Sequence, residues 1–305
     1  KQEVEINLKH FGIGDLLSLA SVKKIKIEKD LMKAVTNILN KNYFTANKFT
    51  NQDYVKIAID VYYQRYHEIL KRIKYGESEN VANEIFGSAS KRLIEPMPGV
   101  LLFLAIIKGW LGKDVEHVLD LIINEYRIKS GKEFRCRSKT ELISRIINLS
   151  KYCEKKPLKV ALVTSSIRYE AEIVMNEVFN VLRKNIASLP LTQSKKELLL
   201  NKFSDFKNVY DAFITASDSN EIILKPHRDL YSIALQQMSI HQNNFNSVIG
   251  FEDSESGTIA MRAAGINLAV ALPFAQTKGH NLTAASFICN GGLAEVILKH
   301  KFFVK

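Results

Sequence analysis

The sequence predicts an α/β protein built on a parallel sheet, because short apolar runs alternate with amphipathic helical patterns from residue 158 onward. Ahead of this part, residues 1–95 carry apolar side chains at the three- and four-residue spacing of helices. Between the two parts, the stretch EPMPG at residues 95–99 holds two prolines and a glycine, which interrupt regular structure. Together these observations predict a helical domain at residues 1–95 and an α/β domain at residues 96–305.

The first domain contains two clear helical patterns, at residues 31–39 and 54–73. Thr50 and Asn51 precede the second pattern as candidate N-caps, and Gly76 follows it as a stop signal. Four tyrosines recur here at helical spacing, which is more typical of packing than of a binding face. They are Tyr54, Tyr62, Tyr63 and Tyr66.

The second domain alternates predicted strands with predicted helices. The strands lie at residues 158–163, 212–215, 248–251 and 267–272, and the helices at residues 168–182, 229–238 and 258–264. Such alternation predicts parallel pairing with helices on both faces of the sheet. Two further helical stretches, at about residues 113–150 and 183–208, are extra to this alternation and are predicted to be helical insertions.

The composition is that of an ordinary globular protein of 305 residues, with 46% hydrophobic and 25% charged residues. No apolar run approaches the roughly 18 residues that a membrane span needs, and the first ten residues lack the apolar region of a secretory signal. Cys136, Cys153 and Cys289 lie far apart without a CxxC spacing, which argues against a zinc site and a disulfide framework. These features predict a cytoplasmic protein.

The chain is strongly basic, with 43 Lys and Arg against 32 Asp and Glu and a formal net charge of +11. Such an excess attracts polyanions or small phosphorylated molecules, although a lysine-rich surface also serves solubility alone. The most basic segment, RCRSK at residues 135–139, lacks the interleaved aromatic side chains of a stacking platform. The pattern therefore disfavours nucleic acid as a partner.

The candidate site is formed by the residues that follow each strand, because ligands of such sheets bind beyond the carboxyl ends of the strands. Thr164, Ser165 and Ser166 follow the first strand and precede a helix. Hydroxyls and free amides at that position bind an anion or simply cap the helix. Lys225 precedes the helix after the second strand, where it offers a positive charge to an anion or is merely solvated.

Two adjacent acids, Glu252 and Asp253, follow the third strand directly and precede a helix that Gly265 ends. Neighbouring carboxylates repel each other, so the pair needs a cation, an acid–base task or water. The helix dipole alone also stabilises acids at this position. Beside hydroxyls and a lysine, however, the pair is better explained as oxygen ligands of Mg²⁺, which favours one or two carboxylates together with water and phosphate.

Three segments then resemble three of the four motifs of the haloacid dehalogenase (HAD) superfamily: VALVTSS, LKPHRDLYSIAL and IGFEDSESGTIAMRAAG. The branch that they resemble most contains sugar-phosphate phosphatases and β-phosphoglucomutase-like proteins. The resemblance implies a Rossmann-like parallel sheet core over about residues 96–300 and a helical cap domain at residues 1–95. It also implies a Mg²⁺-dependent hydrolase, a phosphatase, or a phosphomutase, that acts on a small phosphorylated metabolite.

The same resemblance implies a role for each residue that would face the phosphate. Thr164 would hold the transferred phosphoryl group, Ser165 and Ser166 would line its loop, and Lys225 would neutralise the charge of phosphate and nucleophile. The implied chemistry is attack by an aspartate on a phosphate monoester, followed by hydrolysis of the aspartyl-phosphate.

On this resemblance, Asp253, assisted by Glu252, would hold Mg²⁺. The family's first motif is a strand that ends in Asp-x-Asp-Gly and carries the nucleophile, and no Asp-x-Asp occurs in the 305 residues. We expect this strand to precede Lys1, and without it the sheet would have an exposed gap at its centre. The enzyme interpretation therefore depends on an upstream Asp-x-Asp motif. The alternative is a non-catalytic phosphate-binding or regulatory protein that lacks the nucleophile.

Overall fold

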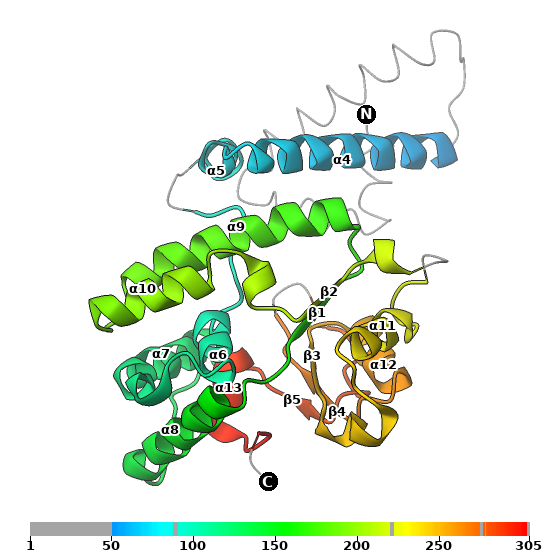
Figure 1. The fold of residues 1–305 in the computed structure, drawn as a ribbon. Coiled ribbons are helices and arrows are strands. Elements are labelled where there is room, and N and C mark those ends of the chain that lie inside the picture. Colours follow the sequence, from blue (N-terminus) through cyan, green and yellow to red (C-terminus); the bar gives the residue numbers. More distant parts are fainter. Residues whose placement is uncertain (1–50, 88–90, 220–222, 275–276, 278, 304–305) are drawn as a thin grey trace. The chain divides into compact units, whose positions relative to one another are not determined.

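The computed structural model describes residues 51–87, 91–219, 223–274, 277 and 279–303. The chain divides into two compact units, Lys1–Ile94 and Glu95–Lys305. In the first unit, helix α4 spans Asn51–Lys74 and helix α5 spans Ser78–Phe86 (Figure 1). The helical pattern at residues 31–39 lies outside the described residues, and the interpretation of this unit as a cap remains a prediction.

The second unit alternates strands and helices from β1 to β4. Its helices, with the 3-10 helices named η, are α6 (Val100–Ile107), η1 (Gly112–Val118), α7 (Leu119–Ser130), α8 (Lys139–Lys155), α9 (Arg168–Ala187), α10 (Gln193–Lys202), η2 (Phe206–Asn208), η3 (Ala216–Asp218), α11 (Asp229–Gln237), η4 (Gln242–Ser247), α12 (Glu255–Ala263) and α13 (Gly292–Lys299). Its strands are β1 (Ala161–Val163), β2 (Ala212–Ile214), β3 (Ile249–Glu252), β4 (Leu268–Ala271) and β5 (Phe287–Ile288). Within the part of the chain that the structure describes, no helix is long and apolar enough to cross a membrane.

Every strand pair among the described residues is parallel, as the alternation of strands and helices predicts. β1 pairs with β2, with Ala161 opposite Ala212. In a second sheet β4 lies between β3 and β5, and Glu252 at the end of β3 lies opposite Ala271. The predicted α/β class is therefore observed, with the strands in two small sheets rather than in one.

Helices cover both faces of these sheets (Figure 1). Helix α11 packs on β1 and β2, and α12 packs on β3 and β4. Helix α6 lies on the opposite face, where Phe103 packs edge-to-face against Phe251 of β3 with ring centres 5.4 Å apart. Successive residues of β4 pack on opposite faces of the sheet. Ala269 packs with buried residues of α11 and α12, and Val270 belongs to the cluster that contains the buried residues of α6. Burial on both faces explains why β2 and β4 are short, continuous apolar runs.

The edges of β1 and β3 that point away from their partner strands are unpaired. Thr164 N–H donates to a carbonyl of β2 at 2.9 Å, so the N–H and C=O groups of Val163 point to the opposite edge of β1. Likewise Glu252 O accepts from Leu272 N–H beyond β4 at 2.6 Å, so the backbone groups of Phe251 point away from β4. Among the described residues, no strand pairs with either edge.

The elements differ from the predicted ones where tertiary contacts intervene. β1 has three residues, shorter than predicted, because Leu158 N–H donates to Ile107 O at the end of α6 instead of joining the strand. The first half of the helix expected after residue 113 is the 3-10 helix η1. β5 and α13 were not predicted, and the two exposed residues of β5 are too short a run to give a pattern.

The segment predicted as an insertion at residues 183–208 is helical, and an aromatic cluster fixes it to α9 and to the end of α6. Phe179 of α9 lies with its ring centre 5.7 Å from Phe203 and 6.3 Å from Phe206. Trp110, just after α6, packs edge-to-face on Phe203 at 5.4 Å. Phe203 and Phe206 are buried, so this aromatic cluster is part of the main hydrophobic core.

The backbone at Gly109, just after α6, lies in close contact with α8, which is possible because glycine has no Cβ. Its φ is +71°, and a Cβ there would lie 2.3 Å from the backbone N of Glu154. Gly131 has a similar φ of +67°, but nothing lies within 4 Å of its Cβ position.

We expect Gly131→Ala to lower the free energy of unfolding by about 1–2 kcal/mol, the cost of a left-handed backbone. Gly109→Ala should lower it by roughly 2 kcal/mol more, because its new Cβ would overlap the backbone of α8. Denaturant unfolding measures both values, and equal losses would contradict the close contact.

Candidate functional site

A buried ion pair joins the carboxyl ends of β1 and β3. The Lys225 ammonium donates to Val163 O, at the end of β1, at 3.2 Å. It also donates to the carboxylate of Glu252, at the end of β3. The side chains of Lys225 and Glu252 are only 11% and 6% exposed, so the pair is shielded from solvent. Because Val163 O belongs to the unpaired edge of β1, one ammonium links the two sheets at their carboxyl ends.

Four donors hold the Glu252 carboxylate. One oxygen accepts from the Lys225 ammonium and from the Tyr231 hydroxyl. The other accepts from Asp253 N–H at 3.2 Å and from the Ser254 hydroxyl at 3.3 Å. With both of its oxygens engaged by protein donors, Glu252 positions Lys225.

The first turn of α12 lies directly against this carboxylate. Ser254 caps the helix, since its Oγ accepts from Gly257 N–H at 3.1 Å. A Cβ at Gly257 would lie 2.1 Å from the carboxyl carbon of Glu252, so only glycine lets the helix approach this closely. The positive end of the helix dipole therefore faces Glu252 and adds to its stabilisation.

The carboxylates of Glu252 and Asp253 repel each other, and Lys225 stabilises the charge of Glu252 more than that of Asp253. Burial disfavours the charged form of Glu252, but the Lys225 charge and the hydrogen bonds from Lys225 and Tyr231 hold its pKa below the ordinary value. Burial and the negative charge of Glu252 raise the pKa of Asp253 to about 6. Burial, followed by the Glu252 charge, raises the pKa of Tyr231 well above its ordinary value, so its hydroxyl remains a donor. A cation beside Asp253 would relieve the remaining repulsion.

Thr164, Ser165 and Ser166 form the turn between β1 and α9. Thr164 Oγ1 accepts from Ser166 N–H at 3.2 Å, and Ser166 O accepts from Ala216 N–H at 2.9 Å. Ser165 is exposed. The N-cap of α9 is Ile167, which makes no side-chain capping bond. The Thr164 hydroxyl therefore shapes the turn, and the N-cap position of α9 lies after the three residues.

The structure brings the predicted residues to one edge of the sheets. Thr164 directly follows Val163, and Asp253 directly follows Glu252. Lys225 contacts both Val163 and Glu252. The structure thus shows that Lys225 contacts the residues just before Thr164 and Asp253, whereas the roles of these residues in binding or catalysis remain predictions.

The acids at this edge fit a magnesium ion as a partial ligand set. Mg²⁺ takes one or two carboxylates and fills its remaining positions with water and phosphate oxygens. Asp253 offers a half-buried carboxylate under repulsion from its neighbour, while Glu252 is engaged by protein donors. Within the described ranges, no group of three or more His, Cys, Asp and Glu side chains could hold a metal. A magnesium ion here would be held by Asp253, with Glu252 behind it, and needs further ligands.

Two side chains at this edge were not predicted from the sequence. Tyr231 of α11 donates to Glu252 and lies with its ring centre 5.1 Å from the Lys225 ammonium. It is close to Lys225 in the sequence, so the helical phase of α11 could have indicated it. Lys129, in the last turn of α7, is near enough to Asp253 for that charge to act on its pKa. It comes from a distant segment, and no sequence pattern connects it with the site.

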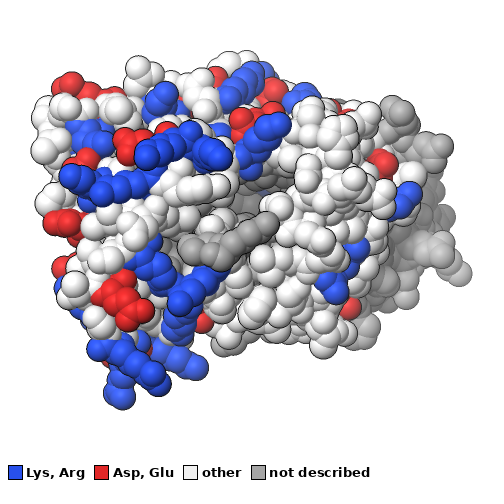
Figure 2. Space-filling model, turned by 60° about the horizontal axis from the view of Figure 1, so that its bottom comes forward, with Lys and Arg blue, Asp and Glu red and all other residues white. Residues whose placement is uncertain are grey.

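The basic residues of residues 113–150 belong to a surface of mixed charge. Figure 2 shows Lys and Arg gathered on the left of the view with Asp and Glu among them. Ion pairs in this part of the chain join Lys139 to Asp120 at 3.2 Å and Lys195 to Asp114 at 3.0 Å. Such pairing is typical of a solvated helical surface.

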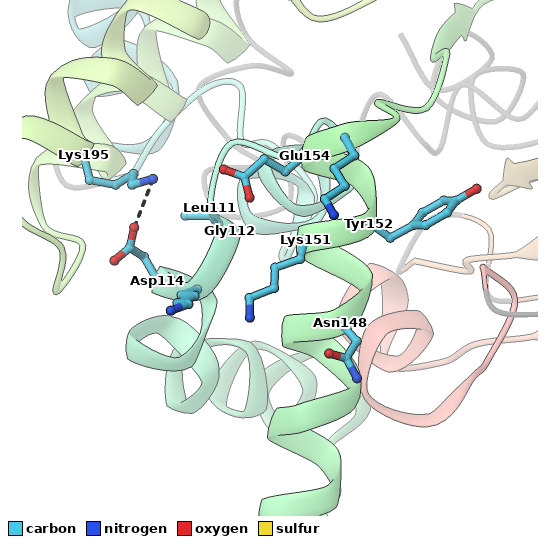
Figure 3. Close-up of a pocket in the computed structure, with 10 residues that line it drawn as sticks. Leu111, Gly112, Asp114, Asn148, Lys151, Tyr152, Glu154 and Lys195 are labelled. Carbon is cyan, nitrogen blue, oxygen red and sulfur yellow. Dashed lines mark ion pairs between the residues drawn. The ribbon is translucent and has the colours of Figure 1, made fainter.

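A pocket of about 540 Å³ lies between η1 and α8. In Figure 3, Glu154 projects from α8 toward Gly112, and Lys195 faces Asp114. None of the predicted site residues lines this pocket, and it contains no strand end. It is therefore separate from the strand-end site.

The fold and this edge define an α/β protein with a lysine, hydroxyls and adjacent carboxylates at the carboxyl ends of parallel strands. No protein-family model matches the chain, and no curated protein matches it. Two crystal structures of CbbY from Rhodobacter sphaeroides, one in complex with xylulose-(1,5)bisphosphate and one with phosphate, are similar to it at 16% identity and a TM-score of 0.28. Each match covers 75% of this chain and 89% of that chain. With so low a TM-score, the similarity carries no argument for the fold or function of this chain.

Removal of the Glu252 charge tests the buried ion pair. We expect Glu252→Gln to lower the free energy of unfolding by about 3–5 kcal/mol, because the buried Lys225 ammonium loses its counter-charge. Asp120→Asn removes one charge of the exposed Lys139–Asp120 pair, and we expect a change within about 0.5 kcal/mol. Denaturant unfolding of both variants at neutral pH is the measurement. Similar small losses in the two variants would show that Lys225 does not depend on Glu252.

Proposed function

We propose that the carboxyl edge of β1 and β3 binds a phosphate group and Mg²⁺, and that the chain is part of a HAD-like phosphatase or phosphomutase for a small phosphorylated metabolite. The observation that carries the proposal is the Lys225–Glu252 pair, which sets Thr164 and Asp253 at the same edge. A hydroxyl, an ammonium and a carboxylate meet the demands of phosphoryl transfer, namely positioning and neutralisation of spread negative charge.

The proposal assigns the nucleophile to a strand between β1 and β3. The facing edges of both strands are unpaired within the described residues, and Lys225 links their carboxyl ends. A parallel strand that pairs with both edges would end beside Lys225 and Asp253. An Asp-x-Asp motif after such a strand would supply a carboxylate nucleophile and a further oxygen ligand, and no such motif occurs in the 305 residues.

In the proposed reaction, the aspartate carboxylate attacks phosphorus, the bond from phosphorus to the leaving oxygen breaks, and this oxygen takes a proton from the second acid of the Asp-x-Asp motif. Water then attacks the aspartyl-phosphate and gives a proton back to that acid, which releases inorganic phosphate and restores the aspartate. Thr164 orients the phosphoryl group, and Lys225 neutralises the charge shared by phosphate and nucleophile. Mg²⁺, held by Asp253, would supply further charge neutralisation when bound.

A second candidate function is phosphate binding without turnover. This function requires no carboxylate nucleophile, and no Asp-x-Asp occurs in the 305 residues. A screen of phosphorylated metabolites with the intact protein and Mg²⁺ separates the two functions, because an enzyme releases inorganic phosphate and a binding protein does not. Phosphate binding in calorimetry without any release would support the binding protein.

Asp253→Asn tests the metal side of the site. We expect this variant of the intact protein to lose Mg²⁺-dependent phosphate release by a factor of about 100 or more, because the substitution removes the carboxylate charge that holds the cation. The free energy of unfolding should change by less than about 1 kcal/mol, since Asp253 is half-exposed and its charge is repelled by Glu252. Unchanged turnover in a colorimetric phosphate assay would contradict the assignment.

A single and a double variant separate the effect of Lys225 on activity from its effect on the stability of the fold. Lys225→Met alone should reduce kcat/KM by roughly 100-fold or more and also destabilise the fold, because Glu252 is left as an unpaired buried charge. Adding Glu252→Gln removes that charge, so the double variant should regain much of the lost stability without regaining activity. Recovery of turnover in the double variant would show that Lys225 acts only through the fold.

A further inference from the structure

The last turn of α7 packs along α13 and contacts both its last residue, Lys299, and its first residue, Gly292. Tyr126 of α7 is buried, and its hydroxyl accepts from the Lys299 ammonium at 2.6 Å. One turn later, the Cγ of Lys129 lies 3.5 Å from the position that a Cβ on Gly292 would take. The stem of Lys129 is therefore held beside the N-terminus of α13 and is not free on the surface.

From this position the Lys129 ammonium reaches the carboxyl edge of the second sheet. It lies 5.9 Å from the ring centre of Phe274, shortly after the end of β4. β4 pairs with β3 in register up to Glu252 opposite Ala271, so Phe274 and Asp253 follow neighbouring strand ends. Burial lowers the pKa of Lys129, and the charge of Asp253 opposes this shift, as expected for two charges that share one environment.

Lys129 lacks the partner that its helix offers. Glu125 lies four residues earlier, the spacing at which Glu and Lys usually pair on a helix. Its carboxylate is buried instead, and Glu125 Oε2 has no hydrogen-bond partner among the described residues. No ion pair involving Lys129 is found in the described part of the chain, whereas Lys225 is paired with Glu252. A half-buried ammonium at this edge thus retains a charge that no carboxylate in contact with it balances.

We propose that Lys129 is a substrate-binding residue, and that the helical segment 113–150 contributes it to hold the anionic group of the substrate at the strand-end site. Lys225 shares its charge with Glu252, so a second ammonium strengthens the binding of an anion at this edge, and Lys129 supplies it. The proposal rests on the proposed function, because it takes phosphate as the ligand of this edge. It gives segment 113–150 a direct part in ligand affinity.

Equilibrium binding of inorganic phosphate to the full chain tests the proposal without any need for turnover. Isothermal titration calorimetry at low ionic strength compares the wild type with Lys129→Met. The matched control is Lys132→Met, which removes the same charge from an exposed position just beyond α7. We expect Lys129→Met to raise the Kd by about tenfold or more, which equals about 1.4 kcal/mol, and Lys132→Met to change it by less than twofold. Added salt should reduce the difference between the two variants.

The outcomes separate the two proposals. If Lys129→Met binds phosphate like the wild type while Lys225→Met loses binding, the role of Lys129 is overturned and the strand-end site stands. If the wild type binds no phosphate, both proposals are overturned. Equal weakening in Lys129→Met and Lys132→Met would also overturn the role of Lys129, since it would reflect net charge alone. If Lys129→Met does not fold, as judged by thermal unfolding, Lys129→Gln is measured against the same criteria.

Discussion

The interaction on which the strand-end region depends is the buried ion pair between Lys225 and Glu252. Burying both charges carries a desolvation cost that attraction between them repays only when their remaining hydrogen-bonding capacity is satisfied. Here that capacity is met by Val163 O, by the hydroxyls of Tyr231 and Ser254 and by the backbone amide of Asp253. The pair therefore fixes the loop before α11, the ends of two strands and the start of α12 at a single point.

A second lysine, Lys108, holds the chain at the other end of β1. The ammonium of Lys108, just after α6, donates to Leu158 O at 3.3 Å and to the Asp211 carboxylate at 2.9 Å. The same carboxylate accepts from Val160 N–H at 2.7 Å, so it ties the approaches to β1 and β2 together. β1 is thus held by a lysine at each end, which compensates for the backbone pairing that it lacks along one edge.

The sequence predicted the parts of the fold that local pattern controls. Alternating strand and helix signals placed β2, α11 and β4 within a residue or two of their observed limits, because both faces of these strands are buried. It overestimated β1, since a contact from α6 to Leu158 ends the strand early. It missed α13, whose position depends on packing against α6 and α7 rather than on a local signal.

The candidate site was predictable where it depends on the order of strands and helices along the chain. Residues that follow strand ends meet at one edge by geometry, so Thr164, Lys225 and Asp253 could be grouped from the sequence alone. The engagement of Glu252 by four donors could not, because it depends on how closely Gly257 lets α12 approach. Lys129 was equally out of reach, since only the tertiary packing of α7 brings it to this edge.

The unpaired edges of β1 and β3 also bear on how the protein folds. A segment that enters between them forms hydrogen bonds on both of its sides at once, so a partly inserted strand gains little and the ordering of that segment is cooperative. An anion that contacts both the end of such a strand and Lys225 adds its binding free energy to the ordering of the strand. Under the proposed function, closure of the sheet by such a strand and occupation of the site would be one linked equilibrium, in which bound phosphate favours the continuous sheet.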